Sequence, residues 1–205
     1  MGSILDCGED AWDKIFDINV KSALMLTQLC VPHMIDRGGG SIVYVTSIAG
    51  SCWTALRGGG ARKIDNEYHS YEKDVEYLLK GLPDKTSYIS IYLLARVLGY
   101  VPINLLGAYS VSKTALLGLT KVVSTAVCDE NIRVNGIAPG IIKTKFSSAL
   151  TANEDIADQT LAQIPLGRFG ESSEIAGVAS FLCSDDAAYI TGETIVAAGG
   201  MMSHL

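Results

Sequence analysis

Residues 104–121 read NLLGAYSVSKTALLGLTK and place a tyrosine, Tyr109, four positions before a lysine, Lys113. Apolar residues recur after it at three- and four-residue steps, which predicts a helix over 107–128. The expected buried face of this helix consists of Ala115, Leu116, Leu119, Val122 and Val123. Because positions four apart share one face of a helix, the Tyr109 and Lys113 side chains can lie together.

Short β-rich runs lie on both sides of this helix in the chain. The predicted strands are Ile42–Val45, a run from Ile132 that breaks at Pro139–Gly140, and Glu193–Val196. The other predicted helices span 9–37 and 172–183, the second with Ser172 or Ser173 as its cap and Glu174 in its first turn. Strands that alternate with helices indicate βαβ units, so the fold class is α/β with a parallel sheet.

Composition suits one soluble domain with a buried sheet. Of the 205 residues, 48% are apolar and 19% are charged. The net charge of −6 gives no reason to expect a nucleic acid as partner, and no apolar run is long enough to predict a membrane span. The five scattered cysteines are expected to be reduced thiols, and the three distant histidines do not suggest a metal site.

One stretch does not fit this alternation. Residues 51–99 contain five of the nine tyrosines and a mixed cluster of charges. They show no sustained period beyond one possible helix near 72–80. A connection of this length is unusual within a compact domain, so we interpret 51–99 as an atypical insertion into a single domain that spans 1–205.

Five segments together resemble the short-chain dehydrogenase/reductase family. They are WDKIFDINVKSA, GGGSIVYVTSIAG, YSVSKTALLGLTK, NIRVNGIAPGIIKT and FLCSDDAAYITGETIV, in the order of the family. The family has a serine thirteen residues before its tyrosine, whereas Ser47 lies 62 residues before Tyr109. Removal of the 49 residues 51–99 restores the family spacing, so the insertion is either an artefact of splicing or gene prediction, or a genuine loop.

The resemblance also implies a glycine-rich T-G-x-x-x-G-x-G turn, which this chain does not contain. In the family that turn binds the dinucleotide pyrophosphate at a helix N-terminus. The expected fold is therefore a partial Rossmann-like, doubly wound parallel sheet, with the C-terminal strands and helices of an N-terminally truncated domain.

By resemblance, four residues are expected to be catalytic in NADP(H)-linked interconversion of a small carbonyl, such as retinal, and an alcohol. Tyr109 is the acid or base, and a nearby Lys113 ammonium favours its phenolate. Ser47 stabilises the substrate oxygen, and Asn19 kinks its helix and anchors a water relay to the lysine. The alternatives are an ordinary surface Tyr–Lys pair, a strand-end serine and a solvent-facing asparagine.

The same resemblance implies the cofactor contacts. The expected cofactor-binding residues are Tyr109, Lys113, Pro139, Gly140, Ile142 and Thr144. Lys113 would bind the nicotinamide ribose, Ile142 the carboxamide through its main chain, and Thr144 the phosphates. An ordinary strand-to-loop turn is the alternative at Pro139–Gly140. The preference for NADP(H) comes from the resemblance alone, and NAD(H) stays open.

Three further expectations concern partners and location. A homo-oligomer is expected through residues 172–198, the region that resembles the subunit interface of the family. The C-terminal Ser-His-Leu resembles a peroxisomal address, so the location is expected to be peroxisomal or cytoplasmic. The competing hypothesis is a non-catalytic truncated variant that lacks the cofactor-binding half and at most associates with full-length subunits.

Overall fold

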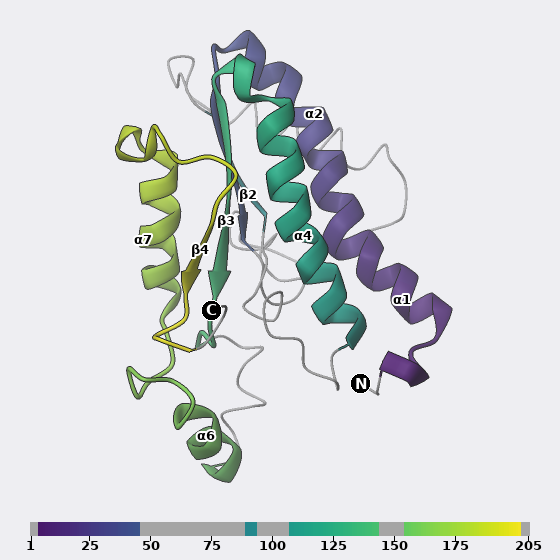
Figure 1. The fold of residues 1–205 in the computed structure, drawn as a ribbon, viewed down its shortest axis with the longest axis vertical. Helices are drawn as coiled ribbons and strands as arrows, with labels where there is room; N and C mark the ends of the chain where they lie inside the picture. Colours follow the sequence, from purple (N-terminus) through teal and green to yellow (C-terminus); the bar gives the residue numbers. More distant parts are fainter. Residues whose placement is uncertain (1–3, 46–88, 94–106, 144–153, 202–205) are drawn as a thin grey trace, which may run out of the picture.

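A computed structural model describes residues 4–45, 89–93, 107–143 and 154–201, which contain one four-stranded sheet (Figure 1). The strands are β1 (Gly40–Val45), β2 (Ile89–Leu93), β3 (Ile132–Pro139) and β4 (Thr194–Ala197). Their order across the sheet is β2-β1-β3-β4, and every neighbouring pair is parallel. The predicted parallel α/β architecture is confirmed.

Helices cover both faces of the sheet, with α2 and α4 on one side and α7 on the other (Figure 1). The helices are α1 (Glu9–Phe16), α2 (Ser22–Asp36), α4 (Gly107–Ala126), α6 (Glu154–Leu161) and α7 (Ser172–Cys183). A π-helical turn, Asp17–Lys21, joins α1 to α2, so the helix predicted over 9–37 is continuous but locally widened. Short 3-10 turns are present at Ile4–Asp6, Cys128–Glu130 and Asp185–Ala187.

Two apolar clusters form the core, one on each face of the sheet. Side chains alternate along β1, so that Ile42 and Tyr44 pack in the cluster with α2 and α4. Val43 and Val45 pack in the cluster with Leu182 of α7 instead. This alternation buries β1 on both sides, which confirms the doubly wound arrangement.

The predicted buried face of α4 is confirmed at Leu116 and Val123, is only partly buried at Ala115 and Leu119, and is wrong at Val122. Leu116 and Val123 are 2% and 7% exposed, and Leu119 packs against the same cluster as a partly buried residue. Val122 is 68% exposed. A helix turns by about 100° per residue, so the residue before buried Val123 points well away from the sheet.

The cap of α7 also differs from the prediction. The helix begins at Ser172 as expected, but Glu171, not Ser172 or Ser173, is the N-cap. The Glu171 side chain accepts a hydrogen bond from the backbone of Glu174, and the Glu174 carboxylate accepts one from the Glu171 N–H. Two carboxylates that satisfy each other's backbone N–H groups act as a capping box.

The segment interpreted as an insertion contributes a strand, β2, which the sequence reading missed. Its backbone pairs with β1 in parallel, with Gly40 opposite Ile89 and Tyr44 opposite Leu93. The alternating isoleucines of SYISIYLL were the available signal. The helix suggested near 72–80 lies outside the described residues.

Within the described ranges, no helix is long and apolar enough to cross a bilayer. The same residues contain no cluster of histidine, cysteine and acidic side chains that could bind a metal ion. Four of the five cysteines are described, and all four are free thiols: Cys7, Cys30, Cys128 and Cys183. Burial raises the pKa of the Cys30 thiol to about 11, so this group stays protonated at neutral pH.

Candidate active site

The first turn of α4 lies at the carboxyl-terminal edge of the sheet, where parallel sheets bind ligands (Figure 1). Tyr109 and Lys113 lie together there, with the Lys113 Nζ atom 5.3 Å from the centroid of the Tyr109 ring. Lys113 is only 3% exposed, and the phenolic oxygen of Tyr109 is shielded from solvent. An exposed surface pair, the alternative interpretation, does not describe this geometry.

Asn19 lies in the π-helical turn and reaches the same part of α4. Its side-chain Nδ2 donates a hydrogen bond of 3.0 Å to the Oγ atom of Ser112. Ser112 in turn donates a bond of 2.7 Å to the backbone carbonyl of Tyr109. The structure therefore brings Asn19 to the Tyr109 turn through Ser112, a residue that the sequence reading did not single out although it directly precedes Lys113.

The end of β3 carries the predicted nicotinamide contacts. Ile142 pairs with Gly170 in an isolated parallel bridge in which Gly170 bonds to the carbonyl of Ile141 and the N–H of Lys143. In this pattern the N–H and C=O groups of Ile142 itself point away from Gly170. This orientation suits a main-chain contact to a carboxamide.

Gly140 has a packing reason to be glycine. A Cβ atom at Gly140 would lie 2.8 Å from the Cα atom of Ala198, which follows β4. The close approach of the two chains therefore requires glycine whether or not a ligand is bound. Its neighbour Pro139 is the last residue of β3.

A cavity of about 380 Å³ opens beside Gly140 and Ile142. It lies on the α7 face of the sheet, and apolar side chains that include Ile175 and Val178 of α7 line it. Tyr109 and Lys113 are not among its lining residues. Their helix, α4, packs on the other face, so the cavity adjoins the predicted cofactor contacts without including the Tyr–Lys pair.

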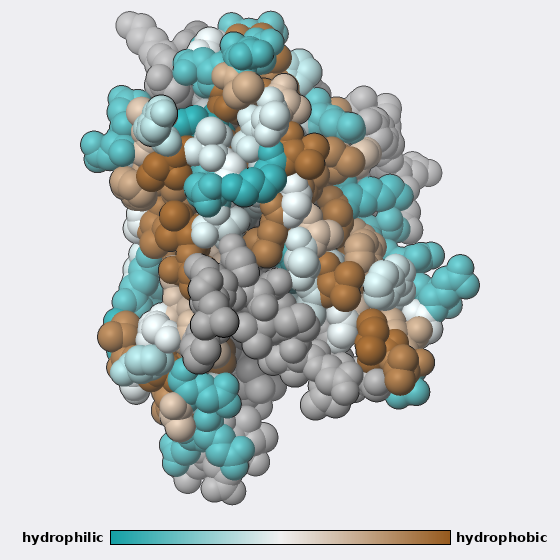
Figure 2. Space-filling model, in the orientation of Figure 1, coloured by the Kyte–Doolittle hydropathy of each residue, from teal (hydrophilic) through white to brown (hydrophobic). Residues whose placement is uncertain are grey.

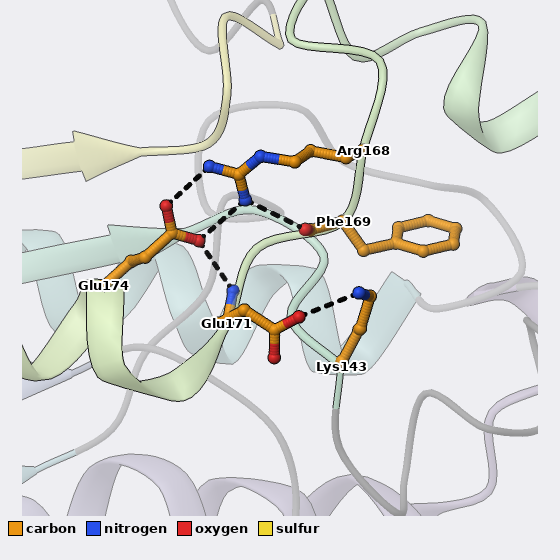
Figure 3. A network of polar contacts seen from close by, with 5 residues as sticks. All are labelled: Lys143, Arg168, Phe169, Glu171 and Glu174. Atoms are coloured by element: carbon orange, nitrogen blue, oxygen red, sulfur yellow. Dashed lines mark hydrogen bonds and ion pairs between the residues drawn. The ribbon is translucent and has the colours of Figure 1, made fainter.

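A polar network fixes the loop beside this cavity (Figure 3). The guanidinium of Arg168 forms bonds of 2.9 and 2.7 Å to the Glu174 carboxylate, which lowers the pKa of that carboxyl to about 2. Lys143 forms an ion pair of 2.8 Å with Glu171. These side chains bind one another and cap α7, which indicates a structural role.

Tyr44 is a buried tyrosine without a proposed catalytic role, and its pKa provides a comparison for Tyr109. Its hydroxyl lies 2.7 Å from the Thr27 hydroxyl, and burial raises the pKa of Tyr44 to about 12. Desolvation disfavours the phenolate. Tyr109 differs because its ring lies beside the Lys113 ammonium.

Two predicted site residues, Ser47 and Thr144, lie outside the described residues. Ser47 follows the last residue of β1, Val45, by two positions in the chain. The structure therefore brings together Asn19, Tyr109 and Lys113, and it places Pro139, Gly140 and Ile142 at the end of β3.

Comparison with known families identifies the chain. Residues 68–202, about two thirds of it, match the family described as Enoyl-(Acyl carrier protein) reductase. Residues 1–57 match the family described as short chain dehydrogenase. The chain belongs to the short-chain dehydrogenase/reductase family. This confirms the resemblance seen in the five segments and assigns the chain to a family of oxidoreductases.

A curated member of this short-chain dehydrogenase/reductase family is similar over the whole chain. Dehydrogenase/reductase SDR family member 4 of Bos taurus is 40% identical over 204 residues. The match covers 100% of this chain but 56% of the relative. The chain thus spans little more than half the length of the relative that it matches.

Solved structures of the family share the fold. A putative short-chain alcohol dehydrogenase from Sinorhizobium meliloti is 32% identical, with a TM-score of 0.70 over 98% of this chain and 60% of that one. A putative 2-deoxy-d-gluconate 3-dehydrogenase from Agrobacterium tumefaciens, solved with bound NADP, is 24% identical. Its TM-score is 0.72 over 99% of this chain and 63% of that structure, which supports the fold alone.

Proposed function

We propose that the chain interconverts a small carbonyl compound and the corresponding alcohol with NADP(H). The observation that carries this proposal is the buried Lys113 ammonium, whose Nζ atom lies 5.3 Å from the centre of the Tyr109 ring. A shielded phenol beside a cation suits acid–base chemistry at a carbonyl oxygen.

Tyr109 delivers a proton to the carbonyl oxygen during reduction and removes it from the alcohol during oxidation. An unperturbed tyrosine has a pKa of about 10, which is too high for an effective base near neutral pH. A positive charge on Lys113, beside the Tyr109 ring, favours the phenolate over the neutral phenol. The contrast is Tyr44, whose pKa burial raises to about 12 although its hydrogen bond with Thr27 acts in the opposite direction.

Two other predicted residues complete the proposed chemistry. Ser47 donates a hydrogen bond to the substrate oxygen and stabilises the negative charge that develops there. Asn19 anchors the relay that returns a proton to Lys113. The hydrogen bond from Asn19 to Ser112, on the helix that carries Tyr109, supports a place for Asn19 in the site.

The described residues fit the nicotinamide half of NADP(H). The N–H and C=O groups of Ile142 point away from Gly170, and the Lys113 Nζ atom lies beside the Tyr109 ring in the first turns of α4. We assign Lys113 and Tyr109 to the ribose, Ile142 to the carboxamide, Pro139 and Gly140 to the ring edge, and Thr144 to the phosphates. When bound, NADP(H) supplies or accepts the hydride.

The test is NADPH binding and turnover by the purified 205-residue chain. Binding is measured by NADPH fluorescence, and turnover by NADPH absorbance with a panel of aldehydes that includes retinal. Lys113→Gln should abolish turnover, whereas Lys121→Gln, on the same helix but 63% exposed, should not change it. Failure to bind NADPH at high concentration would refute the catalytic proposal for this chain and leave its family assignment intact.

The second candidate is the non-catalytic variant, since these 205 residues contain no T-G-x-x-x-G-x-G turn for the pyrophosphate of the cofactor. It predicts no NADPH binding but association with a full-length family member, measured by analytical ultracentrifugation of the mixture. A homo-oligomer through residues 172–198 would appear in the same measurement on the chain alone. Phe181 and Tyr189, 42% and 103% exposed, are apolar side chains of this region available for such contacts.

We also propose peroxisomal targeting by the C-terminal Ser-His-Leu, with the cytoplasm as the alternative location. A fluorescent protein fused to the N-terminus of the chain should co-localise with a peroxisomal marker. Deletion of the last three residues should leave the fusion diffuse. A diffuse signal from the intact fusion would refute the proposal.

A further inference from the structure

One hydroxyl group joins the π-helical turn to the turn of α4 that carries Tyr109. The Oγ atom of Ser112 accepts a hydrogen bond from Asn19 Nδ2 at 3.0 Å and donates one to the Tyr109 carbonyl at 2.7 Å. Ser112 is 0% exposed, so water does not compete for either bond. We propose that Ser112 is a positioning residue that sets the geometry of Tyr109 and Lys113.

Serine in a helix often bonds to the carbonyl three or four residues before it, so that bond alone carries no argument. Ser124, in the same helix, makes such a bond to the Lys121 carbonyl at 2.8 Å and is 5% exposed. Ser112 is distinguished by the second bond, which comes from Asn19, 93 positions away in the chain. That bond ties two separate helices together.

The π-helical turn explains why Asn19 reaches α4. A π turn inserts an extra residue into a helix and rotates the side chains that follow, and such turns are frequent at functional sites. Asn19 lies within the turn Asp17–Lys21, which packs against α4. An asparagine amide can donate the required hydrogen bond, whereas an aspartate could only accept.

The consequence for the site follows from the position of Tyr109 near the start of α4. The first turn of a helix has backbone N–H groups without partners in the helix, and it opens more readily than the middle. The Asn19–Ser112 bond holds this turn against the π-helical turn. A looser turn would let the Lys113 ammonium move away from the Tyr109 ring and would weaken its stabilisation of the phenolate.

The inference rests on the proposed function for its kinetic effect but not for its spectroscopic effect. The first measurement is a phenolate absorbance titration of the purified chain, from which the titration of Tyr109→Phe is subtracted to isolate Tyr109. Ser112→Ala should move the Tyr109 titration to higher pH. Ser124→Ala removes the same local bond elsewhere on α4 and should leave the titration in place. Circular dichroism checks that each variant is folded.

The second measurement is turnover. Ser112→Ala should lower kcat by about 10- to 100-fold with little change in KM, because misplacement of a reacting group acts on the chemical step. Asn19→Ala should have a similar effect, and the double variant should be no worse than either single one. Ser124→Ala should keep the kcat of the wild type.

The outcomes separate this inference from the proposed function. If the chain shows no turnover but Ser112→Ala still shifts the Tyr109 titration, the proposed function fails and the positioning role stands. If Tyr109 titrates at the same pH in Ser112→Ala as in Ser124→Ala, the positioning role is refuted, even if the enzyme is active. If Ser112→Ala does not fold, Tyr109 is titrated in Asn19→Ala instead. This variant removes the Asn19–Ser112 bond by changing its other partner.

Discussion

Two groups of polar side chains on opposite faces of the sheet lie in different environments. On the α4 face, the polar groups Ser112, Lys113 and Thr27 are at most 4% exposed. Ser112 bonds to Asn19 of the π-helical turn, Thr27 to Tyr44 of β1, and Lys113 lies beside the Tyr109 ring. On the α7 face, the side chains of the Lys143–Glu171 and Arg168–Glu174 pairs are about half exposed. Figure 2 shows one side of the molecule, with apolar patches along both α7 and α4 between polar surfaces.

This difference indicates where the molecule depends on single contacts. A buried polar group that loses its partner retains its full desolvation cost, whereas an exposed ion pair contributes little and is screened by salt. We therefore expect substitutions of buried groups on the α4 face to have large effects on activity and stability. Substitutions in the exposed ion pairs of the α7 face should have small effects on both.

Among the substitutions that compare the two faces, the largest expected effect is that of Tyr109→Phe on turnover. Removal of the proposed acid–base group should lower kcat with an aldehyde by about 10²- to 10⁴-fold. The control on the α7 side is Tyr189→Phe, because Tyr189 is 103% exposed. It should keep the activity of the wild type. Retention of activity by Tyr109→Phe would remove the functional contrast between the two faces.

The next effect concerns the stability of α4. Leu116, 2% exposed, packs in the apolar cluster of this face, and Leu116→Ala should lower the free energy of unfolding by about 2–5 kcal/mol. Val122, 68% exposed on the same helix, should tolerate alanine with a change within about 0.5 kcal/mol. Urea denaturation measures both values. Equal losses would contradict the described orientation of α4.

A third comparison sets a buried hydroxyl pair against an exposed ion pair. Thr27→Val keeps the side-chain shape but leaves the buried Tyr44 hydroxyl without its 2.7 Å contact, which should cost about 1–3 kcal/mol. Lys143→Met breaks the ion pair with Glu171 and should cost about 0–1 kcal/mol. The same urea experiment compares them, and a larger loss for Lys143→Met would invert the proposed contrast.

The smallest effect is the pH dependence contributed by Glu174. Its hydrogen bonds from Arg168 lower the pKa of the carboxyl to about 2 in the folded protein, from an ordinary value of 4.5. A folded pKa below the unfolded one stabilises the protein above about pH 4.5, and this contribution is lost as the pH falls towards 2. Glu174→Gln should therefore flatten the decline of Tm between pH 5 and pH 2, weakly, since the pair is exposed.

Glu193→Gln is the control for this pH experiment. It removes one carboxylate from the exposed pair with Lys121 without touching the cap of α7. If Glu174→Gln and Glu193→Gln give the same Tm profile between pH 2 and pH 5, the Arg168 contact is not the cause of the pH dependence.

Much of the fold could be predicted from the sequence, because strand and helix periods are local signals. The strand from Ile132 to Pro139 and the helix from Ser172 to Cys183 agree with the predicted elements. Two local predictions were wrong. Val122 is exposed although the next residue, Val123, is buried, and Glu171 rather than Ser172 or Ser173 caps α7. These choices depend on which side of a helix meets the sheet and which side chain reaches the first turn.

The candidate site was predictable only in part. The spacing of Tyr109 and Lys113 predicts one shared helix face, and the structure places the two side chains together. Nothing local indicates that Ser112 would accept a bond from Asn19, because a serine that bonds within its own helix looks the same in sequence. The strand β2 was missed for a related reason. A short β-rich run does not show by itself that it pairs with another strand, and the pairing with β1 is a contact between distant segments.

The sequence by itself determined the alternation of strands and helices, the family and the residue types that could carry acid–base chemistry. These follow from periodicity and from motifs whose members lie within a few positions of one another. Only the tertiary structure decided that Lys113 is buried against Tyr109 and that Asn19 and Ser112 meet. Burial and contacts between distant segments depend on how whole elements pack, and a short window of sequence does not contain that information.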